Sequence, residues 1–397
     1  NWVEGLTTYL ANYYWHELTG DEQQAMEQRR LMVEGYSLYV EPEQDYPVSR
    51  FFTKEDEKDN AIGYHKAAFI FHHLRHELGE EPFWRGLKTF VQRYRNQPAD
   101  WSDIEAVFTQ ESGRDLRWFF DQWVEQGGAP QVSLEEVRAY QVQVSEEPGR
   151  WRVLVRMGQS GRPFQMAVPL RVVLDNGTET KWIRLGPAAM TREEVSVSAR
   201  PLAVQVDPQW MVFRRIPRSR LTPMLNGYVT DSRRTVGLLS TEGGKVFQPI
   251  LDRIAERESP WPESRKTVIV SFGEMALPPA GSMLVLGGAD QRHRIEPLVK
   301  ESCGDLVRFR EEGVDVKGRT YEGPETAVLL TCRRVAVPAS VVTVLYSLSP
   351  GAVERLAPYL FYYGWHSYVV FKNGTVVERG VWQDGPEMKE VEVNDVR

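Results

Sequence analysis

The sequence predicts a multidomain α+β protein made of three successive regions. Apolar residues recur at helical spacing in residues 1–130, alternate with polar residues in 131–217, and form continuous runs between helices in 218–397. A chain of 397 residues exceeds the roughly 250–300 residues at which a single hydrophobic core stops growing. We therefore expect a helical region, a β-sandwich and a small α/β layered domain, in that order.

The helical region carries clear start and stop signals. Helix-favouring residues fill 21–32, and apolar residues three and four apart mark one buried helix face in 64–78. Gly79 follows that face as a C-cap glycine would. A capping box at Ser102 opens the next helix, and the Gly-Gly-Ala-Pro run at 127–130 ends the helical pattern.

The middle region has the period-two pattern of short strands separated by turns. The run Asp175-Asn176-Gly177 predicts a hairpin, because Asn-Gly readily adopts the positive φ angles of a type I′ turn. The clearest predicted strands are 151–156, 169–174, 182–185 and 202–206. We expect these strands to form the β-sandwich.

In the last region, near-continuous apolar runs alternate with helices, as is typical of strands buried on both faces. The strands are expected at 267–271, 283–286, 327–330, 341–345 and 368–371, and the helices at 245–258, 294–301 and 349–362. One hypothesis makes this region a small-molecule or peptide-binding accessory domain, since ligands of such sheets lie at the carboxyl ends of the strands.

The bulk composition excludes several classes of protein. With 42% hydrophobic and 26% charged residues, the chain has the composition of a globular protein. A net charge of −7 argues against a nucleic-acid partner, which would require a basic face. No apolar run reaches the roughly 18 residues of a transmembrane segment. The two cysteines, Cys303 and Cys332, form no disulfide framework, and we expect two buried thiols.

Two short segments carry residues suited to hydrolytic chemistry. Glu4 lies between Val3 and Gly5 in the opening helix, and a carboxylate there can serve as a metal ligand of fixed direction. Tyr64 opens the helix of residues 64–78, where a phenol can donate to an oxyanion that develops in a transition state. Taken singly, a glutamate is more often a surface charge and a tyrosine more often a core residue.

In their order along the chain, these segments resemble the gluzincin zinc aminopeptidases, the family of membrane alanyl aminopeptidase. Residues 2–9 resemble the family's W-x-E-G or W-x-x-E-G segment with a Tyr just beyond, and residues 64–67 resemble its Y-x-K-G/A segment. Similar runs in the helical scaffold are 71–79, 83–84, 101–103, 113–116, 118–123 and 128–130. The resemblance implies that residues 1–130 form the all-α C-terminal half of a thermolysin-like catalytic domain.

The resemblance also implies a zinc-dependent metallopeptidase that hydrolyses peptide substrates. Glu4 would be the third zinc ligand, beside two histidines of an H-E-x-x-H helix, and Tyr64 would stabilise the oxyanion. No H-E-x-x-H occurs in the 397 residues, so we expect a C-terminal fragment that is inactive and binds no zinc tightly by itself. Two departures are Val3, where the family commonly has Asn, and the absence of its G-x-M-E-N-like segment.

His72 and His76 form a competing constellation, because histidines four apart on a helix can bind zinc. His72 is followed by His73, so this pair lacks the glutamate that would act as general base. At about 100° per residue, His65, His72, His73 and His76 all fall away from the apolar face. We therefore expect exposed histidines without a metal.

The alternative function is a non-enzymatic scaffold or partner-binding protein derived from the peptidase fold. An H-E-x-x-H about 20 residues upstream of Glu4 would decide for the enzyme. Two further motifs suggest no reaction. Residues 286–290 match neither a dinucleotide fingerprint nor a P-loop, so we expect a tight turn there, and residues 363–368 (Tyr-Gly-Trp-His-Ser-Tyr) are distinctive without a chemistry.

Overall fold

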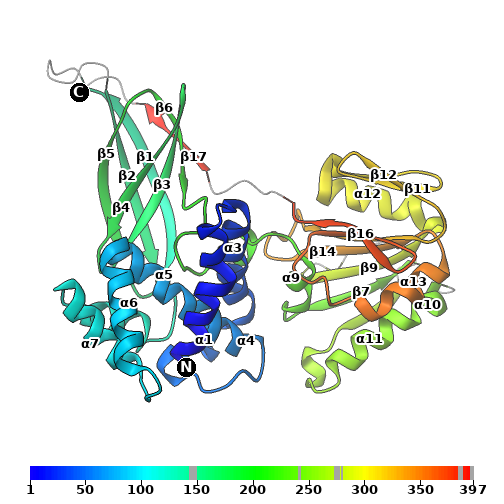
Figure 1. Cartoon of the computed structure of the whole chain (residues 1–397). Coiled ribbons are helices and arrows are strands. Elements are labelled where there is room, and N and C mark those ends of the chain that lie inside the picture. The colour runs from blue at the N-terminus through cyan, green and yellow to red at the C-terminus, as the bar shows by residue number, and fades with distance from the viewer. Residues whose placement is uncertain (143–149, 240–242, 272–277, 279, 383–387, 394–397) are drawn as a thin grey trace. The chain divides into compact units, whose positions relative to one another are not determined.

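A computed structural model of the chain divides into two compact units (Figure 1). The first unit contains Asn1–Ile216 with Gly385–Arg397, and the second contains Pro217–Asp384. The structure describes all residues except 143–149, 240–242, 272–277, 279, 383–387 and 394–397. Helices and several sheets are both present, so the mixed α+β class predicted from the sequence is confirmed.

Helices make up the first part of the first unit (Figure 1). They are α1 (Trp2–Thr7), α2 (Trp15–Leu18), α3 (Glu22–Tyr39), α4 (Glu57–Asn60), α5 (Ala67–Leu78), α6 (Glu80–Tyr94), α7 (Trp101–Ser112) and α8 (Arg117–Trp123). The π-helical turns η1 (Thr8–Tyr14) and η4 (Ala61–Lys66) join α1 to α2 and α4 to α5. In the described part of the chain, no helix is long and apolar enough to cross a membrane.

Local capping chemistry sets the ends of these helices. Gly79 and Gly113 follow α5 and α7 with φ angles of +87° and +67°, a region that glycine adopts without strain. The capping box of α7 is formed by Asp100 and Asp103, so the prediction that Ser102 opens this helix is wrong. The carboxylate of Asp100 accepts from the backbone N–H groups of Ser102 at 2.8 Å and Asp103 at 3.2 Å, as an N-cap residue does.

Two four-stranded sheets complete the first unit, in the orders β18-β1-β2-β5 and β17-β6-β3-β4 (Figure 1). The strands are β1 (Gln131–Gln141), β2 (Trp151–Ser160), β3 (Met166–Leu174), β4 (Gly177–Leu185), β5 (Met190–Val197), β6 (Pro201–Val206), β17 (Met388–Glu390) and β18 (Glu392–Val393). The predicted hairpin joins β3 to β4, with Asp175 and Asn176 between the paired residues Leu174 and Gly177. The two short strands β17 and β18 add residues from the end of the chain to these sheets.

A seven-stranded sheet of order β16-β15-β13-β14-β9-β7-β8 forms the centre of the second unit (Figure 1). Its strands are β7 (Arg234–Leu238), β8 (Val268–Ser271), β9 (Ser282–Gly288), β13 (Thr326–Arg333), β14 (Val341–Ser347), β15 (Tyr368–Lys372) and β16 (Thr375–Gly380). Strands β8, β7, β9 and β14 are parallel, and β13, β15 and β16 run antiparallel to their neighbours. The apolar predictions for this region therefore fall on strands of one central sheet.

Separate apolar clusters cover the two faces of this sheet. One cluster includes residues of α9 (Leu225–Val229), α11 (Gln248–Glu258) and α13 (Pro350–Leu356), and α10 (Gly243–Val246) precedes α11. The other cluster includes residues of α12 (Arg292–Cys303) and of the small sheet β10 (Val307–Phe309), β11 (Gly313–Val316) and β12 (Arg319–Glu322). The sheet is thus a layer between two cores, which explains its continuous apolar strands.

The distinctive run at residues 363–368 has a structural explanation. A Cβ on Gly364 would lie 2.1 Å from Oδ1 of Asn226, so a larger residue would collide at that position. Ser367 is fully buried, and its Oγ accepts from the backbone N–H of Trp382 at 3.0 Å. The indole N–H of Trp382 in turn donates to the carbonyl oxygen of Thr331 at 2.7 Å. This motif ties the start of β15 to the segment after β16 and to β13, and it needs no catalytic role.

The two cysteines form a disulfide between Cys303, at the end of α12, and Cys332 in β13. The expectation of two buried thiols is therefore wrong. Both residues are buried, as predicted. They are 29 residues apart in the sequence and meet only because α12 packs over β13, which the sequence pattern does not indicate. The bond ties one covering helix directly to the central sheet.

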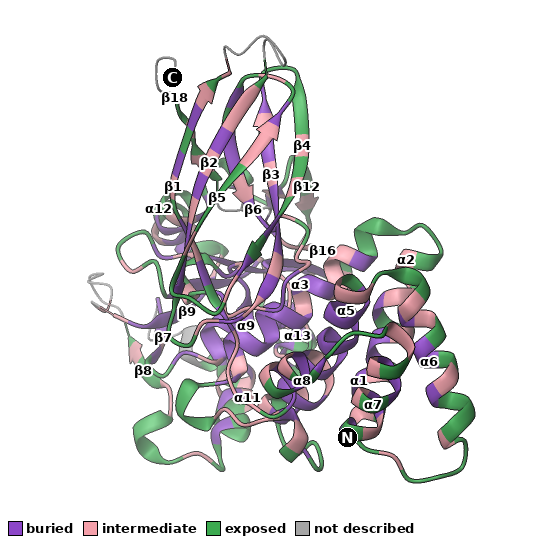
Figure 2. Cartoon of the chain, turned by 90° about the vertical axis from the view of Figure 1, so that its left-hand side faces the viewer, coloured by how far each residue is buried: buried purple, intermediate pink, exposed green. Residues whose placement is uncertain are grey.

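Helix α5 is buried around most of its circumference, as Figure 2 shows. His72 and His73 are buried, so the prediction that they are exposed is wrong; of the remaining histidines of that prediction, His65 is half-buried and His76 is exposed. Helical periodicity identified one packed face, whereas a loop after β6 packs against the other face. The ring nitrogen Nε2 of His72 lies 3.0 Å from the carbonyl oxygen of Met211, and Nε2 of His73 accepts from the N–H of Phe213 at 3.1 Å.

The disulfide should stabilise the second unit. Closing a loop of this length restricts the unfolded chain by about 3.6 kcal/mol in the chain-entropy model. Replacing Cys303 and Cys332 by Ala should increase hydrogen exchange of α12 and β13 in the full chain under non-reducing conditions. Dithiothreitol should produce the same increase in the native chain and no further increase in the double variant. Equal exchange in the oxidised native chain and the double variant would contradict this prediction.

The buried histidines should make stability fall in mild acid. Burial lowers the pKa of His73 from 6.5 to about 3, so the unfolded chain takes up a proton below pH 6.5 while the folded chain does not. Stability should be complete above pH 6.5 and fall as the pH decreases towards 3, with a loss from His73 of about 2 kcal/mol at pH 5. Urea unfolding at pH 7.5 and pH 5 measures this difference.

The variant His73→Gln keeps an acceptor for the N–H of Phe213 and removes the titrating ring. It should reduce the difference in unfolding free energy between the two pH values by about 2 kcal/mol. His293→Gln, which alters an exposed histidine of the second unit, should leave that difference unchanged. The same pH dependence in all three proteins would show that His73 does not cause it.

Candidate active site

Helix α1 packs against the start of helix α5 at Gly5. A Cβ on Gly5 would lie 2.5 Å from Cβ of Ala67 and 2.7 Å from its carbonyl carbon, so only glycine fits without displacing one of the helices. Glu4 directly precedes Gly5, and Tyr64 lies one helical turn before Ala67. This contact therefore brings together the two elements that carry the two candidate residues.

Phe51 holds both of these elements from a third segment of the chain. The side-chain amide of Asn1 donates to three carbonyl groups of the loop 48–51, at 2.9–3.1 Å. The ring of Phe51 covers Gly63, where a Cβ would lie 2.4 Å from the ring. The same ring meets the ring of Tyr64 edge-on, with 5.8 Å between the ring centres. One loop thus fixes both the beginning of α1 and the position of Tyr64.

Lys66 anchors the π-helical turn η4 on its inner side. Its side chain is fully buried, and its Nζ donates to the carbonyl oxygen of Gln126 at 3.0 Å. Burial lowers the pKa of Lys66 to about 8, while the nearby carboxylate of Asp45 favours its charged form. Asp45 itself accepts from the N–H of Gly128 at 3.0 Å. The sequence pattern did not reveal this role, because a helical lysine is normally exposed.

Glu4 and Tyr64 are both half-buried. Among the described residues, no hydrogen bond or ion pair is found for either polar group. Tyr64 lies within the π-helical turn η4, and such turns occur frequently at functional sites. The apolar residues near the start of α1 are unusually open, with Val3 49% exposed and Phe52 94% exposed.

The described residues fit zinc only in part. Glu4 offers a carboxylate of the kind that zinc accepts, but a catalytic zinc site needs three protein ligands. No group of three His, Cys, Asp or Glu side chains in the described part of the chain is arranged to hold a metal ion. The rings of His72 and His76 meet edge-on at 4.5 Å, and His72 already uses Nε2 for the carbonyl group of Met211.

Comparison with known proteins identifies relatives of the helical region. Residues 2–123 match the peptidase family M1 domain. Aminopeptidase N of Lactococcus lactis subsp. lactis is 32% identical over 114 residues, which cover 26% of this chain and 13% of that protein. Aminopeptidase N of Caulobacter vibrioides is 33% identical over 96 residues, which cover 24% of this chain and 10% of that protein.

A solved structure, Legionella pneumophila aminopeptidase A in complex with aspartic acid, is 16% identical and matches 66% of this chain and 28% of that one, with a TM-score of 0.35. The sequence matches span 13% and 10% of the length of the two aminopeptidases N. They coincide with the helical region that carries Glu4, Gly5 and Tyr64. Residues 2–123 are thus similar to the domain of peptidase family M1, in agreement with the resemblance to the gluzincin aminopeptidases seen in the sequence.

Proposed function

We propose that this chain contributes the C-terminal part of the catalytic domain of a zinc-dependent aminopeptidase. Residues 1–130 would be the helical half of a thermolysin-like domain, followed by a β-sandwich in 131–217 and an α/β accessory domain in 218–397. The observation that carries the proposal is the close packing of Gly5 on Ala67. It brings the elements of Glu4 and Tyr64 together, in a region that matches the peptidase M1 domain.

In this proposal, Glu4 is the third zinc ligand. Its carboxylate is half-buried and lacks a cationic partner among the described residues, so it is free to face a metal ion. Gly5 fixes its direction, because the backbone of α1 cannot move closer to or slide along α5 at that point. When bound, zinc would act as a Lewis acid on the carbonyl group of a peptide substrate.

Tyr64 would donate its hydroxyl group to the oxyanion that forms when the peptide carbonyl is attacked. A hydrogen-bond donor that is already in position stabilises the charge that develops in the transition state, because the protein does not have to rearrange during the reaction. Three features hold Tyr64 in place: the ring of Phe51 against it, the close contact of Gly63 with that ring, and the buried Lys66 two residues later. A phenol that is held but lacks a partner suits this role.

Exposed apolar side chains near the start of the chain support a further partner segment. They are Val3 of α1 and Trp15 and Leu18 of α2, which are 49%, 57% and 62% exposed. Large exposed apolar side chains can mark a surface that contacts another segment. We propose that the segment carrying H-E-x-x-H contacts these helices, and that the 397 residues alone neither hydrolyse peptides nor hold zinc tightly.

The first test compares the 397-residue chain with a longer product of the same reading frame that contains H-E-x-x-H. The longer protein should bind one zinc ion and hydrolyse alanine p-nitroanilide, whereas the chain alone should do neither, because one carboxylate cannot close a zinc site. Zinc is measured by elemental analysis after dialysis. Hydrolysis by the chain alone would contradict the proposed inactivity. A reading frame without H-E-x-x-H would favour the scaffold function instead.

The second test separates the roles of the two residues in the longer protein. Glu4→Gln should lose bound zinc and activity together. Tyr64→Phe should keep zinc and reduce kcat by about 100-fold, the usual effect of removing an oxyanion donor. Glu22→Gln, an exposed glutamate at the start of α3, and Tyr362→Phe, a 75% exposed tyrosine, serve as controls without effect. Unchanged kcat in Tyr64→Phe would remove Tyr64 from the mechanism.

A further inference from the structure

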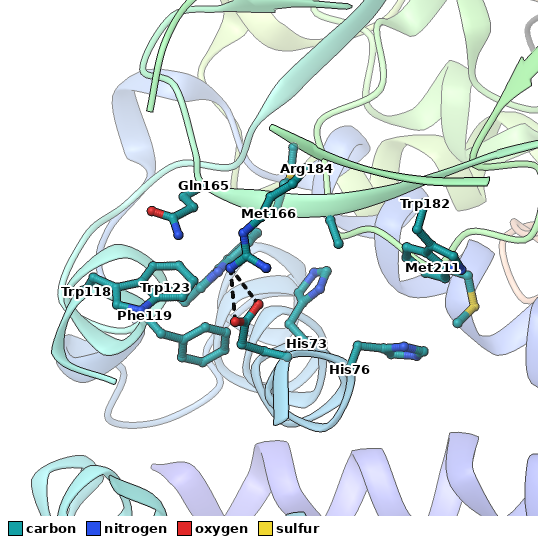
Figure 3. Close-up of a pocket in the computed structure, with 12 residues that line it drawn as sticks. His73, His76, Trp118, Phe119, Trp123, Gln165, Met166, Trp182, Arg184 and Met211 are labelled. Carbon is teal, nitrogen blue, oxygen red and sulfur yellow. Dashed lines mark hydrogen bonds and ion pairs between the residues drawn. The ribbon is translucent and has the colours of Figure 1, made fainter. Parts of the chain in front are cut away.

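A cavity opens between the far end of α5 and the strands β3 and β4, within the first unit (Figure 3). It is open on one side, and its volume is about 90 Å³. His73 lies nine residues beyond Tyr64 on the same helical run, which is about 13 Å along a helix axis. This cavity therefore uses side chains other than those assigned to zinc and to the oxyanion.

The walls of the cavity are mainly aromatic. Helix α8 contributes Trp118, Phe119 and Trp123, and Met166 of β3 lies beside them (Figure 3). At the other side, Trp182 of β4 stacks on the ring of His76 at 5.6 Å, and it is 48% exposed. Such walls suit a flat aromatic group.

His73 lines the cavity and carries one hydrogen-bond donor. Its Nε2 accepts from the backbone N–H of Phe213, which can only donate, so the neutral ring must carry its proton on Nδ1. The ring is buried and stacks on Trp123 at 4.7 Å, which prevents it from turning. Among the described residues, no acceptor is found for this Nδ1–H. A ligand that bears an acceptor would satisfy it.

Glu77 and Arg184 line the cavity, and Arg114, beside it, brings a second positive charge to Glu77. The carboxylate of Glu77 is buried between two guanidinium groups, since Arg184 donates to both of its oxygens at 3.0 Å and Arg114 also pairs with it (Figure 3). One of the two arginine charges is therefore not neutralised within this group. Arg184 follows Trp182 by two residues on β4, so both side chains lie on the same face of the strand.

These charges decide between two kinds of ligand. Several tryptophans beside a carboxylate could form a cage for an organic cation. Here, however, two arginines already neutralise Glu77, and Arg184 itself lines the cavity. A cation would be repelled by the remaining positive charge, whereas an anion would be attracted to it.

We propose that this cavity binds a small aromatic carboxylate. Its ring would lie among Trp118, Phe119 and Trp123, and its carboxylate would accept from Arg184 and from Nδ1–H of His73. The proposal rests on the packing of the first unit alone and is independent of zinc and of peptide hydrolysis. Its failure would leave the proposed function unaffected.

The test is a titration of the full 397-residue chain with phenylacetate, followed by calorimetry and by ligand-observed saturation-transfer NMR. Saturable binding of one phenylacetate per chain is expected. Arg184→Gln should weaken this binding at least tenfold, because it removes a charge-assisted contact. Trp182→Ala, at the exposed rim, should weaken it at least threefold. Both positions are largely exposed, so these variants should fold.

Three controls make the result decisive. Arg192→Gln removes one positive charge from an exposed position on β5, outside the cavity, and should change the affinity less than twofold. 2-Phenylethylamine has the same ring with the opposite charge and should not bind saturably, and acetate lacks the ring and should also fail. The proposal is overturned by absent phenylacetate binding, by equal binding in Arg184→Gln and the native chain, or by preferred binding of the amine.

Discussion

The burial of helix α5 around most of its circumference is the constraint on which the first unit depends. Helix α1 packs on its start at Gly5, helices α6 and η1 flank it, and the loop after β6 covers its remaining side. A helix in this position cannot shift without breaking several contacts at once. The positions of the candidate residues near the start of α5 and of the aromatic cavity therefore both depend on how this helix is packed.

Several buried polar side chains of α5 and of the turn before it find partners within the unit. Lys66 donates to a carbonyl group, His73 accepts from a backbone N–H, and Arg75 donates to the hydroxyl of Tyr9 at 2.8 Å. An unpaired buried polar group would cost about 1–3 kcal/mol. Asp207 helps to fix the loop that contacts the two buried histidines. Its carboxylate accepts from the backbone N–H groups of Met211 and Val212 in that loop.

The sequence predicted the type of most elements but not the way they pack. Helical spacing located α5 correctly from its apolar residues, yet it placed His72 and His73 at the surface, because periodicity describes one helix and not the segments around it. The same limit explains why the disulfide between Cys303 and Cys332 was not predicted, because it depends on α12 lying over β13.

For the candidate site, sequence motifs singled out Glu4 and Tyr64 but not the residues that hold them. Phe51 belongs to a loop without a regular pattern, and its contacts with Gly63 and Tyr64 join residues from separate segments. The lysine beside Tyr64 carried no signal of burial, since lysine is almost always exposed. Motifs thus single out candidate groups, whereas the supporting contacts arise only when the helices are packed together.

The paired polar groups of α5 make the groups without a partner near this helix candidates for ligand binding. His73 and Arg75 each find a partner within the unit, through Nε2 and a guanidinium nitrogen. Glu4 and Tyr64, beside the start of α5, have none among the described residues, and the same holds for Nδ1–H of His73. Glu4 and Tyr64 are half-buried and His73 lines the cavity, whereas Nδ1 of His72 is also unpaired but buried. The positions of these three residues therefore favour ligands over a purely structural helix.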